Sequence, residues 1–127
     1  MSEFVDKLIA VERELSAEKG GFSFFGLLER VRIDAKAAKQ YDLVVAAPWL
    51  DADSDVQLHS LISVVTHALT SDEWRNISAV VILPVDHPGI VNMNTMLSAE
   101  HSHIDQSDNI VNGFKMKSGL VITSKRR

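Results

Sequence analysis

The chain has 127 residues, of which 46% are hydrophobic and 24% charged, and its formal net charge is −4. These values are typical of one globular domain with a single hydrophobic core, and they argue against a disordered chain. The acidic balance also argues against a general nucleic-acid binder, because such proteins present a basic patch or stripe. The sequence has no cysteine, which excludes disulfides, thiol catalysis and cysteine-bound zinc.

The N-terminal segment MSEFVDKLIAVEREL carries acids and bases throughout. This pattern argues against a signal peptide or a membrane span, so we expect a cytoplasmic protein without membrane contact. Apolar residues recur at helical spacing at Phe4, Leu8, Val11 and Leu15, and Gly20-Gly21 is typical of a helix end. The segment therefore predicts an amphipathic helix over residues 2–19, which either covers a sheet or docks against a partner.

The next segments predict strands and a crossover. Residues 22–33 alternate from Leu28 onward, which predicts a strand with one wet face. Residues 42–49 are apolar throughout, and the short connection favours an antiparallel hairpin with the preceding strand. A helix should then begin at Asp53 or Ser54, and Thr70-x-x-Glu73 fits the capping box of a shorter one. Residues 79–83 would return as a strand parallel to 42–49.

The remaining segments complete the predicted domain. Asp86 or His87 would cap a helix with Pro88 at its first position. Asn112-Gly113 is a hairpin signal, and residues 119–123 form a last apolar strand. We therefore predict one α/β or α+β domain over residues 1–127, with a flexible tail at about 125–127. Its mixed sheet of about five strands, with 42–49 and 79–83 near the centre, would be covered by two to three helices.

Two predicted strand ends share one layout. YDLVVAAPWLD at 41–51 and SAVVILPVDH at 78–87 each pass from an apolar run through a proline to an aspartate. Ligands commonly bind beyond the carboxyl ends of such strands. We therefore predict a ligand or partner site formed by Trp49, Asp51, Asp53 and Asp86. The alternative for Trp49 is a core position beneath the second helix.

The D-x-D-x-D sequence at Asp51, Asp53 and Asp55 has a second interpretation. Three oxygens at alternate positions suit calcium or magnesium, but Val56 and Ile62 stand where a calcium loop needs glycine and glutamate. Acidic residues ahead of a helix also satisfy its free N–H groups and complement its dipole. A local helix start is therefore the alternative to a ligand site.

A possible metal site comes from an H-x-H-x-D sequence. His101, His103 and Asp105 would project from one face of a strand, and Asp86-His87 at a neighbouring strand end could complete the set. Imidazole and carboxylate groups suit zinc, iron or manganese. The pattern predicts His87, His101, His103 and Asp105 as ligands of a divalent metal, with an exposed polar strand face as the alternative. We expect no other cofactor.

Three functions remain open from the sequence. The favoured one is a small interaction or regulatory domain acting through a protein-binding surface, because no complete catalytic motif or nucleotide-binding glycine loop is present. The others are a small-molecule sensor with a pocket near Trp49 and Asp51, and a metal-dependent hydrolase using the His/Asp cluster. A non-enzyme is favoured. The long helix and an exposed edge strand both permit a homodimer.

Overall fold

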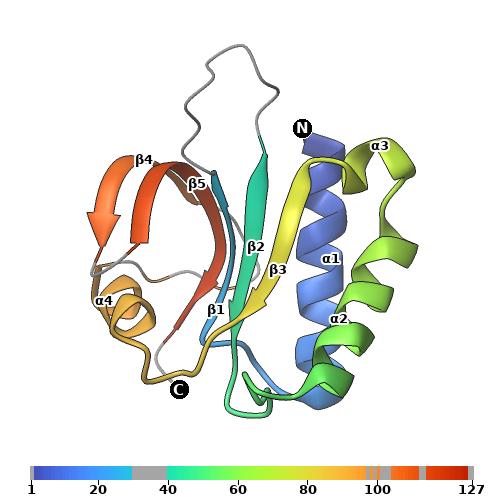
Figure 1. Cartoon of the computed structure of the whole chain (residues 1–127), viewed down its shortest axis with the longest axis horizontal. Coiled ribbons are helices and arrows are strands. Elements are labelled where there is room, and N and C mark those ends of the chain that lie inside the picture. The colour runs from blue at the N-terminus through green and yellow to red at the C-terminus, as the bar shows by residue number, and fades with distance from the viewer. Residues whose placement is uncertain are drawn as a thin grey trace.

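The computed structural model describes residues 2–29, 40–96, 98, 100, 104–111 and 114–125. Over these residues it has four helices and five strands (Figure 1). In chain order they are α1 (Ser2–Lys19), β1 (Phe24–Glu29), β2 (Tyr41–Ala46), α2 (Asp55–Ala68), α3 (Ser71–Trp74), β3 (Ile77–Ile82), α4 (Pro88–Met96), β4 (Ile104–Val111) and β5 (Phe114–Ser124).

The strands form one mixed sheet in the order β3-β2-β1-β5-β4. β1 pairs antiparallel with β2 and β5, and β4 pairs antiparallel with β5, whereas β2 and β3 run parallel. Parallel neighbours need a crossover connection, which α2 and α3 supply. The structure thus confirms a single α+β domain with a mixed sheet, including the predicted β1–β2 pairing and the parallel crossover.

The centre of the sheet differs from the prediction. β1 is the central strand and is buried along its whole length. The wet face predicted for this segment is therefore wrong for Phe24–Glu29, because β1 has a strand on each side and helices over both faces; residues 30–33 lie outside the described residues. β3, predicted near the centre, is instead an edge strand, and its middle residues are partly accessible.

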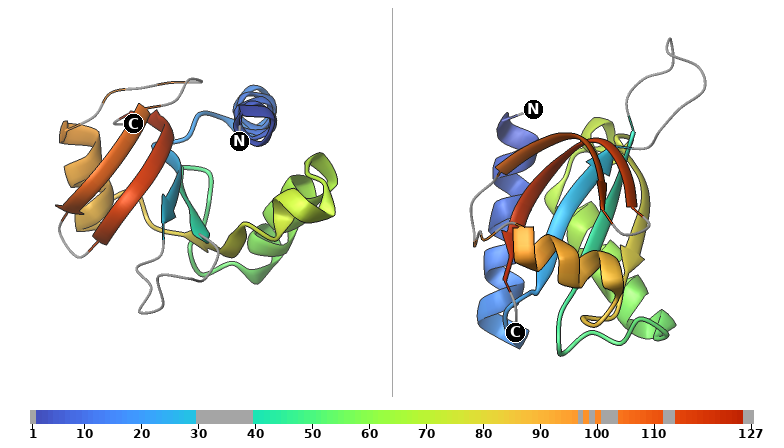
Figure 2. Two further views of the ribbon diagram at one scale, coloured as in Figure 1. Left: turned by 90° about the horizontal axis from the view of Figure 1, so that it is seen from above. Right: turned by 90° about the vertical axis from the view of Figure 1, so that its left-hand side faces the viewer.

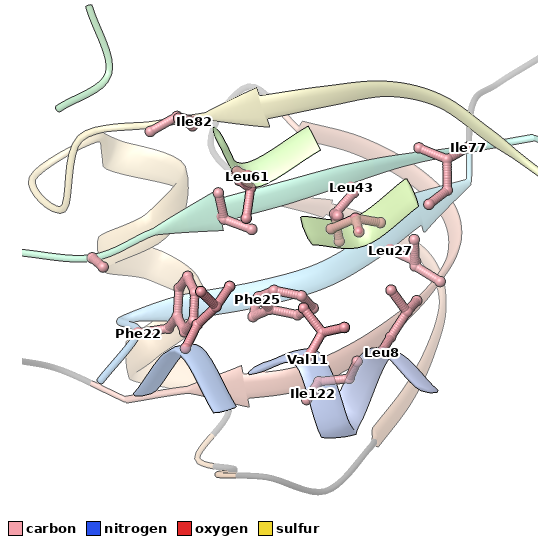
Figure 3. Close-up of a cluster of buried hydrophobic side chains, with 14 of the residues drawn as sticks. Leu8, Val11, Phe22, Phe25, Leu27, Leu43, Leu61, Ile77, Ile82 and Ile122 are labelled. Atoms are coloured by element: carbon pink, nitrogen blue, oxygen red, sulfur yellow. The ribbon is translucent and has the colours of Figure 1, made fainter. Parts of the chain in front are cut away.

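Helices cover both faces of the sheet, so the domain has three layers (Figure 2). Alternating strand residues supply two apolar clusters. Phe25, Leu27, Leu43 and Val45 belong to the cluster that includes residues of α1 and α2 (Figure 3). Phe24, Leu28, Val44 and Ala46 belong to the cluster that includes residues of α4. The two to three helices predicted fall short of the four observed, since α3 and α4 both form.

α1 packs through its predicted apolar stripe and ends at the predicted signal. Phe4, Leu8, Val11 and Leu15 are all buried. After Lys19, Gly20 adopts a φ of +124°. Residues with a side chain are strained in this backbone conformation, whereas glycine adopts it readily.

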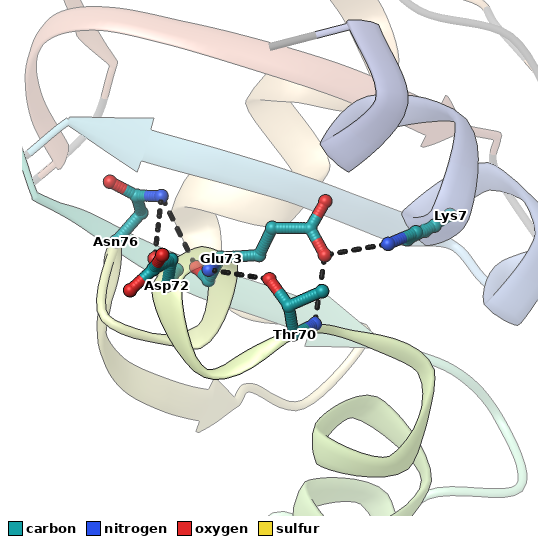
Figure 4. A network of polar contacts seen from close by, with 5 residues as sticks. All are labelled: Lys7, Thr70, Asp72, Glu73 and Asn76. Atoms are coloured by element: carbon teal, nitrogen blue, oxygen red, sulfur yellow. Dashed lines mark hydrogen bonds and ion pairs between the residues drawn. The ribbon is translucent and has the colours of Figure 1, made fainter.

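An ion pair fastens α1 to α3 (Figure 4). Lys7 Nζ donates to Glu73 Oε1 at 2.8 Å, and the backbone N–H of Thr70 donates to the same oxygen at 2.8 Å. Thr70 and Glu73 form the predicted capping box. The hydrogen bond between the two side chains lowers the pKa of Glu73 and raises the pKa of Lys7.

The C-terminal strands form the predicted hairpin arrangement. β4 and β5 pair antiparallel up to Val111 and Phe114. Asn112 and Gly113, like residues 126–127 of the predicted tail, lie outside the described residues.

Candidate functional site

The side chain of Trp49, in the loop that follows β2, makes its contacts within the protein. Its indole Nε1 donates to the carbonyl oxygens of Gly20 at 2.7 Å and Gly21 at 3.2 Å. Its ring meets Phe22 edge-on, with centroids 5.2 Å apart. The side chain is half-buried, and it ties the loop before α2 to the segment that follows α1. This arrangement resembles the alternative to a ligand site, in which Trp49 belongs to the core.

The aspartates beyond β2 form a local turn. Asp51 Oδ1 accepts a hydrogen bond from the backbone N–H of Asp53 at 2.9 Å. Ser54 is the N-cap of α2, and its hydroxyl accepts from the N–H of Gln57 at 3.2 Å. Asp51, Asp53 and Asp55 are exposed, so each contact seen here serves the helix start that was the alternative to a ligand site.

The structure describes only some of the residues that the sequence predicted as metal ligands. His87 Nδ1 accepts a hydrogen bond from the N–H of Gly89 at 3.0 Å, so this imidazole, one of the two residues predicted for the role, caps α4. Asp86 beside it is exposed. His101 and His103 lie outside the described residues, and Asp105 is described only as part of β4. Among the residues that the structure describes, no three His, Cys, Asp or Glu side chains gather into a metal site.

A pocket does exist near Trp49, but it is small. It has a volume of about 60 Å³, between the end of α1, the loop after β2 and the first turns of α2. Its lining residues are Leu15, Lys19, Trp49, Leu50, Gln57, Ser60, Leu61 and Val64. Pockets for drug-sized ligands are roughly 300–1,000 Å³. Trp49 lines this pocket, and neither Asp51 nor Asp53 is among its lining residues.

A larger open groove lies between α1 and α2. Its volume is about 520 Å³, and its lining residues are Val11, Glu14, Ser63, Val64, His67 and Ala68. We call it the α1–α2 groove. Val64 also lines the smaller pocket, so the two hollows adjoin along α2. Figure 2 shows the two helices side by side over one face of the sheet.

The groove has an apolar floor and a polar rim. Val11 is buried and Val64 and Ala68 are half-buried, whereas Glu14, Ser63 and His67 are exposed. Nδ1 of His67 donates to the carbonyl oxygen of Ser63 at 2.6 Å. That bond occupies the nitrogen facing the Ser63 hydroxyl, so the pair is not arranged as a nucleophile and its base.

Sequence reasoning missed the groove, although one signal was present. Val64 and Ala68 lie beside the buried stripe of α2, which widens its apolar face beyond what the sheet covers. Whether the neighbouring helix closes over that extra width depends on the spacing of α1 and α2, which no local pattern specifies.

Negative charge predominates over the helical layer. The exposed carboxylates of α1, α2, α3 and the loop before α2 are Glu3, Asp6, Glu14, Glu18, Asp51, Asp53, Asp55 and Asp72. The exposed cations of the same segments are Arg13 and Lys19, and Arg75 directly follows α3. The groove therefore sits in a surface that attracts cations and repels a second surface of the same kind.

The chain was compared with protein families, curated proteins and solved structures. No family model matches the chain, and the comparisons found no match among curated proteins or solved structures. Over the described residues, no helix has both the length and the apolar character that crossing a membrane requires.

Proposed function

We propose that this chain is an interaction domain that binds an amphipathic helix of a protein partner in the α1–α2 groove. The observation that carries the proposal is the open hollow of about 520 Å³ with Val11, Val64 and Ala68 at its floor. Helix-in-groove recognition uses such a floor, because apolar side chains one turn apart on the partner can insert into it together.

The dimensions of the two hollows set the length of the partner helix. Along α2 the lining residues run from Gln57 to Ala68. At about 1.5 Å per residue this distance is roughly 16 Å, or about three helical turns. A partner segment of roughly 11 residues would cover it, with apolar residues spaced by three or four positions.

The charge of the surface selects the chemistry of that helix. Glu14 stands on the rim, and carboxylates outnumber cations across the helical layer. A partner with lysine or arginine on its polar face would gain from this field, chiefly in association rate and specificity. An acidic helix, or the same face of a second copy, would meet like charge.

Two synthetic peptides test the proposal. One has leucines at positions 1, 4, 5, 8 and 11 with lysines between them, and its twin has glutamates in place of the lysines. Fluorescence anisotropy should show that the lysine peptide binds and that added salt weakens it, while the glutamate peptide does not bind. Backbone NMR shifts should concentrate on Val11, Val64 and Ala68.

Two substitutions on α2 localise the binding. Ser63→Trp fills the groove from an exposed position, and Val56→Glu changes a residue that is 79% exposed and lines neither hollow. The lysine peptide should lose at least tenfold in affinity for the first variant and none for the second. Equal affinity for both variants, or shifts that map away from the groove, would refute the proposal.

A further inference from the structure

The small pocket near Trp49 has walls that are held in place by contacts within the protein. Its aliphatic lining residues are Leu15, Leu50, Leu61 and Val64. The indole of Trp49 is fixed by its hydrogen bonds to the two carbonyl groups after α1. The side-chain amide of Gln57 donates to Trp49 O at 3.1 Å, and its oxygen accepts from the N–H of Asp51. A side chain that enters the pocket therefore meets walls that are already ordered.

The volume of the pocket limits what it can hold. At about 60 Å³ it has less than half of the roughly 150 Å³ of an apolar cavity that accommodates benzene. An aromatic ring is therefore too large for it, whereas the branched end of one leucine side chain fits. Because most of the lining is apolar, replacing water there by methyl groups is favourable.

The charges beside the two hollows have opposite signs. Lys19 and Ser60 line the small pocket and are exposed, and the side chain of neither has a hydrogen bond or ion pair with another described residue. The carboxylate of Glu14 stands instead on the rim of the α1–α2 groove. A helix has free carbonyl groups and a partial negative charge at its carboxyl end, and the opposite at its amino end. A bound helix is complementary to both hollows when its carboxyl end lies over Lys19.

We propose that the small pocket is the anchor site of the α1–α2 groove, and that it takes one leucine side chain from the carboxyl half of the partner helix. The inference rests on the function proposed above and adds the direction of the helix and the residue that anchors it. The partner runs antiparallel to α2, with its amino end towards Ala68 and its carboxyl end towards Gln57. Val64 lines both hollows, so one continuous helix can cover them.

Size selection by the pocket is tested with the lysine peptide. The stretches of α2 that line the two hollows have midpoints roughly 7 Å apart along the helix. In the proposed direction, the leucine at position 8 of the peptide lies over the pocket and the one at position 4 lies over the groove. Fluorescence anisotropy should show about a tenfold loss of affinity with phenylalanine at position 8. Phenylalanine at position 4 should change the affinity little, because the groove is wide.

The direction of the helix is tested by a cycle of two changes, one on each partner. The peptide is made with a free terminal carboxylate or with a terminal amide, and the protein as wild type or Lys19→Gln. Lys19→Gln should weaken the carboxylate peptide roughly twofold to fivefold more than the amide peptide. Arg13→Gln is the matched control, since Arg13 is an exposed cation of α1 that lines neither hollow. It should affect both peptides equally, and circular dichroism checks that both variants fold.

The outcomes separate this inference from the function on which it rests. A lysine peptide that binds in the groove but tolerates phenylalanine at position 8 as well as at position 4 overturns the anchor site and leaves the proposed function standing. Selection against phenylalanine at position 4 alone, or equal losses of both peptides with Lys19→Gln, overturns the proposed direction in the same way. If no peptide binds, or if the backbone NMR shifts map away from both hollows, the proposed function fails and the inference fails with it.

Discussion

Replacing Trp49 by phenylalanine tests whether this side chain fastens the loop before α2 to the end of α1. The substitution keeps an aromatic ring against Phe22 but removes the Nε1 donor to Gly20 and Gly21. The two carbonyl groups belong to half-buried residues, so water can replace part of what is lost. We expect the missing hydrogen bond to cost about 1 kcal/mol.

The smaller ring adds a burial cost to the lost hydrogen bond. For a half-buried indole this cost is roughly 0.5–1 kcal/mol, which brings the total to about 1.5–2 kcal/mol of unfolding free energy. At about 2.1 cal/mol/K per residue, the unfolding entropy of a chain this long lowers Tm by about 4 °C for each kcal/mol. Trp49→Phe should therefore melt about 6–8 °C below the wild type.

Trp74→Phe is the matched control for ring size. Trp74 is also half-buried and packs at the border of the same apolar cluster, but its indole makes no hydrogen bond with any described residue. This variant should lose only the burial contribution, about 2–4 °C in Tm. Urea titrations followed by circular dichroism give the two free energies. If Trp49→Phe costs no more than Trp74→Phe, the bonds to Gly20 and Gly21 do not fasten the loop.

Substitutions at three further positions have defined outcomes. Lys7 holds the pKa of Glu73 below its ordinary value of 4.5, so ionised Glu73 stabilises the fold above that pH and the contribution is lost as pH falls through the lowered folded-state pKa. Urea midpoints of wild type and Glu73→Gln should accordingly differ at neutral pH and converge in acid; a constant gap would count against the pair. Gly26→Ala would place a Cβ 3.1 Å from Leu120 O and 3.0 Å from Phe24 Cζ, and should cost about 1–3 kcal/mol in urea unfolding. Ser54→Ala removes the cap on Gln57 N and should cost about 1 kcal/mol, whereas Ser54→Asp should retain most of the stability.

The sequence predicted those elements whose signals are local. The helical spacing from Phe4 to Leu15, the capping box at Thr70 and the cap at His87 are each confirmed. Hydrophobic periodicity and capping chemistry act within a few residues, so each can be recognised without knowledge of the rest of the chain.

The arrangement of the sheet depended on longer-range pairing. Continuous apolar runs suggested β2 and β3 as the centre, but β5 returns beside β1 and leaves β3 at an edge. A run of apolar residues reports burial on two faces and not the number of strand neighbours. In β1, the alternation that begins at Leu28 therefore gave no sign that α4 would cover the second face.

The contacts of the predicted site residues also lay beyond what local patterns could predict. Trp49, Asp51 and Asp53 do lie together after β2, but their hydrogen bonds are used locally to start α2 and to hold the end of α1. The α1–α2 groove arises from residues of two helices that are far apart in the chain. Its floor could be located only once the packing of those helices on the sheet was known.

Two sets of contacts hold α1 in place, and they explain why the groove can remain open. The Lys7–Glu73 pair holds the first half of α1 to α3, and the Trp49 bonds hold the segment after α1 to the loop that precedes α2. The groove residues Val11 and Glu14 lie between these two points. A helix fixed near both ends can leave its middle separated from α2 without drifting across the sheet. A groove that is already ordered before the partner binds loses less conformational entropy on binding. Trp49, which sequence reasoning assigned to the site, would therefore support the proposed binding indirectly, by fixing the helix that forms one wall of the groove.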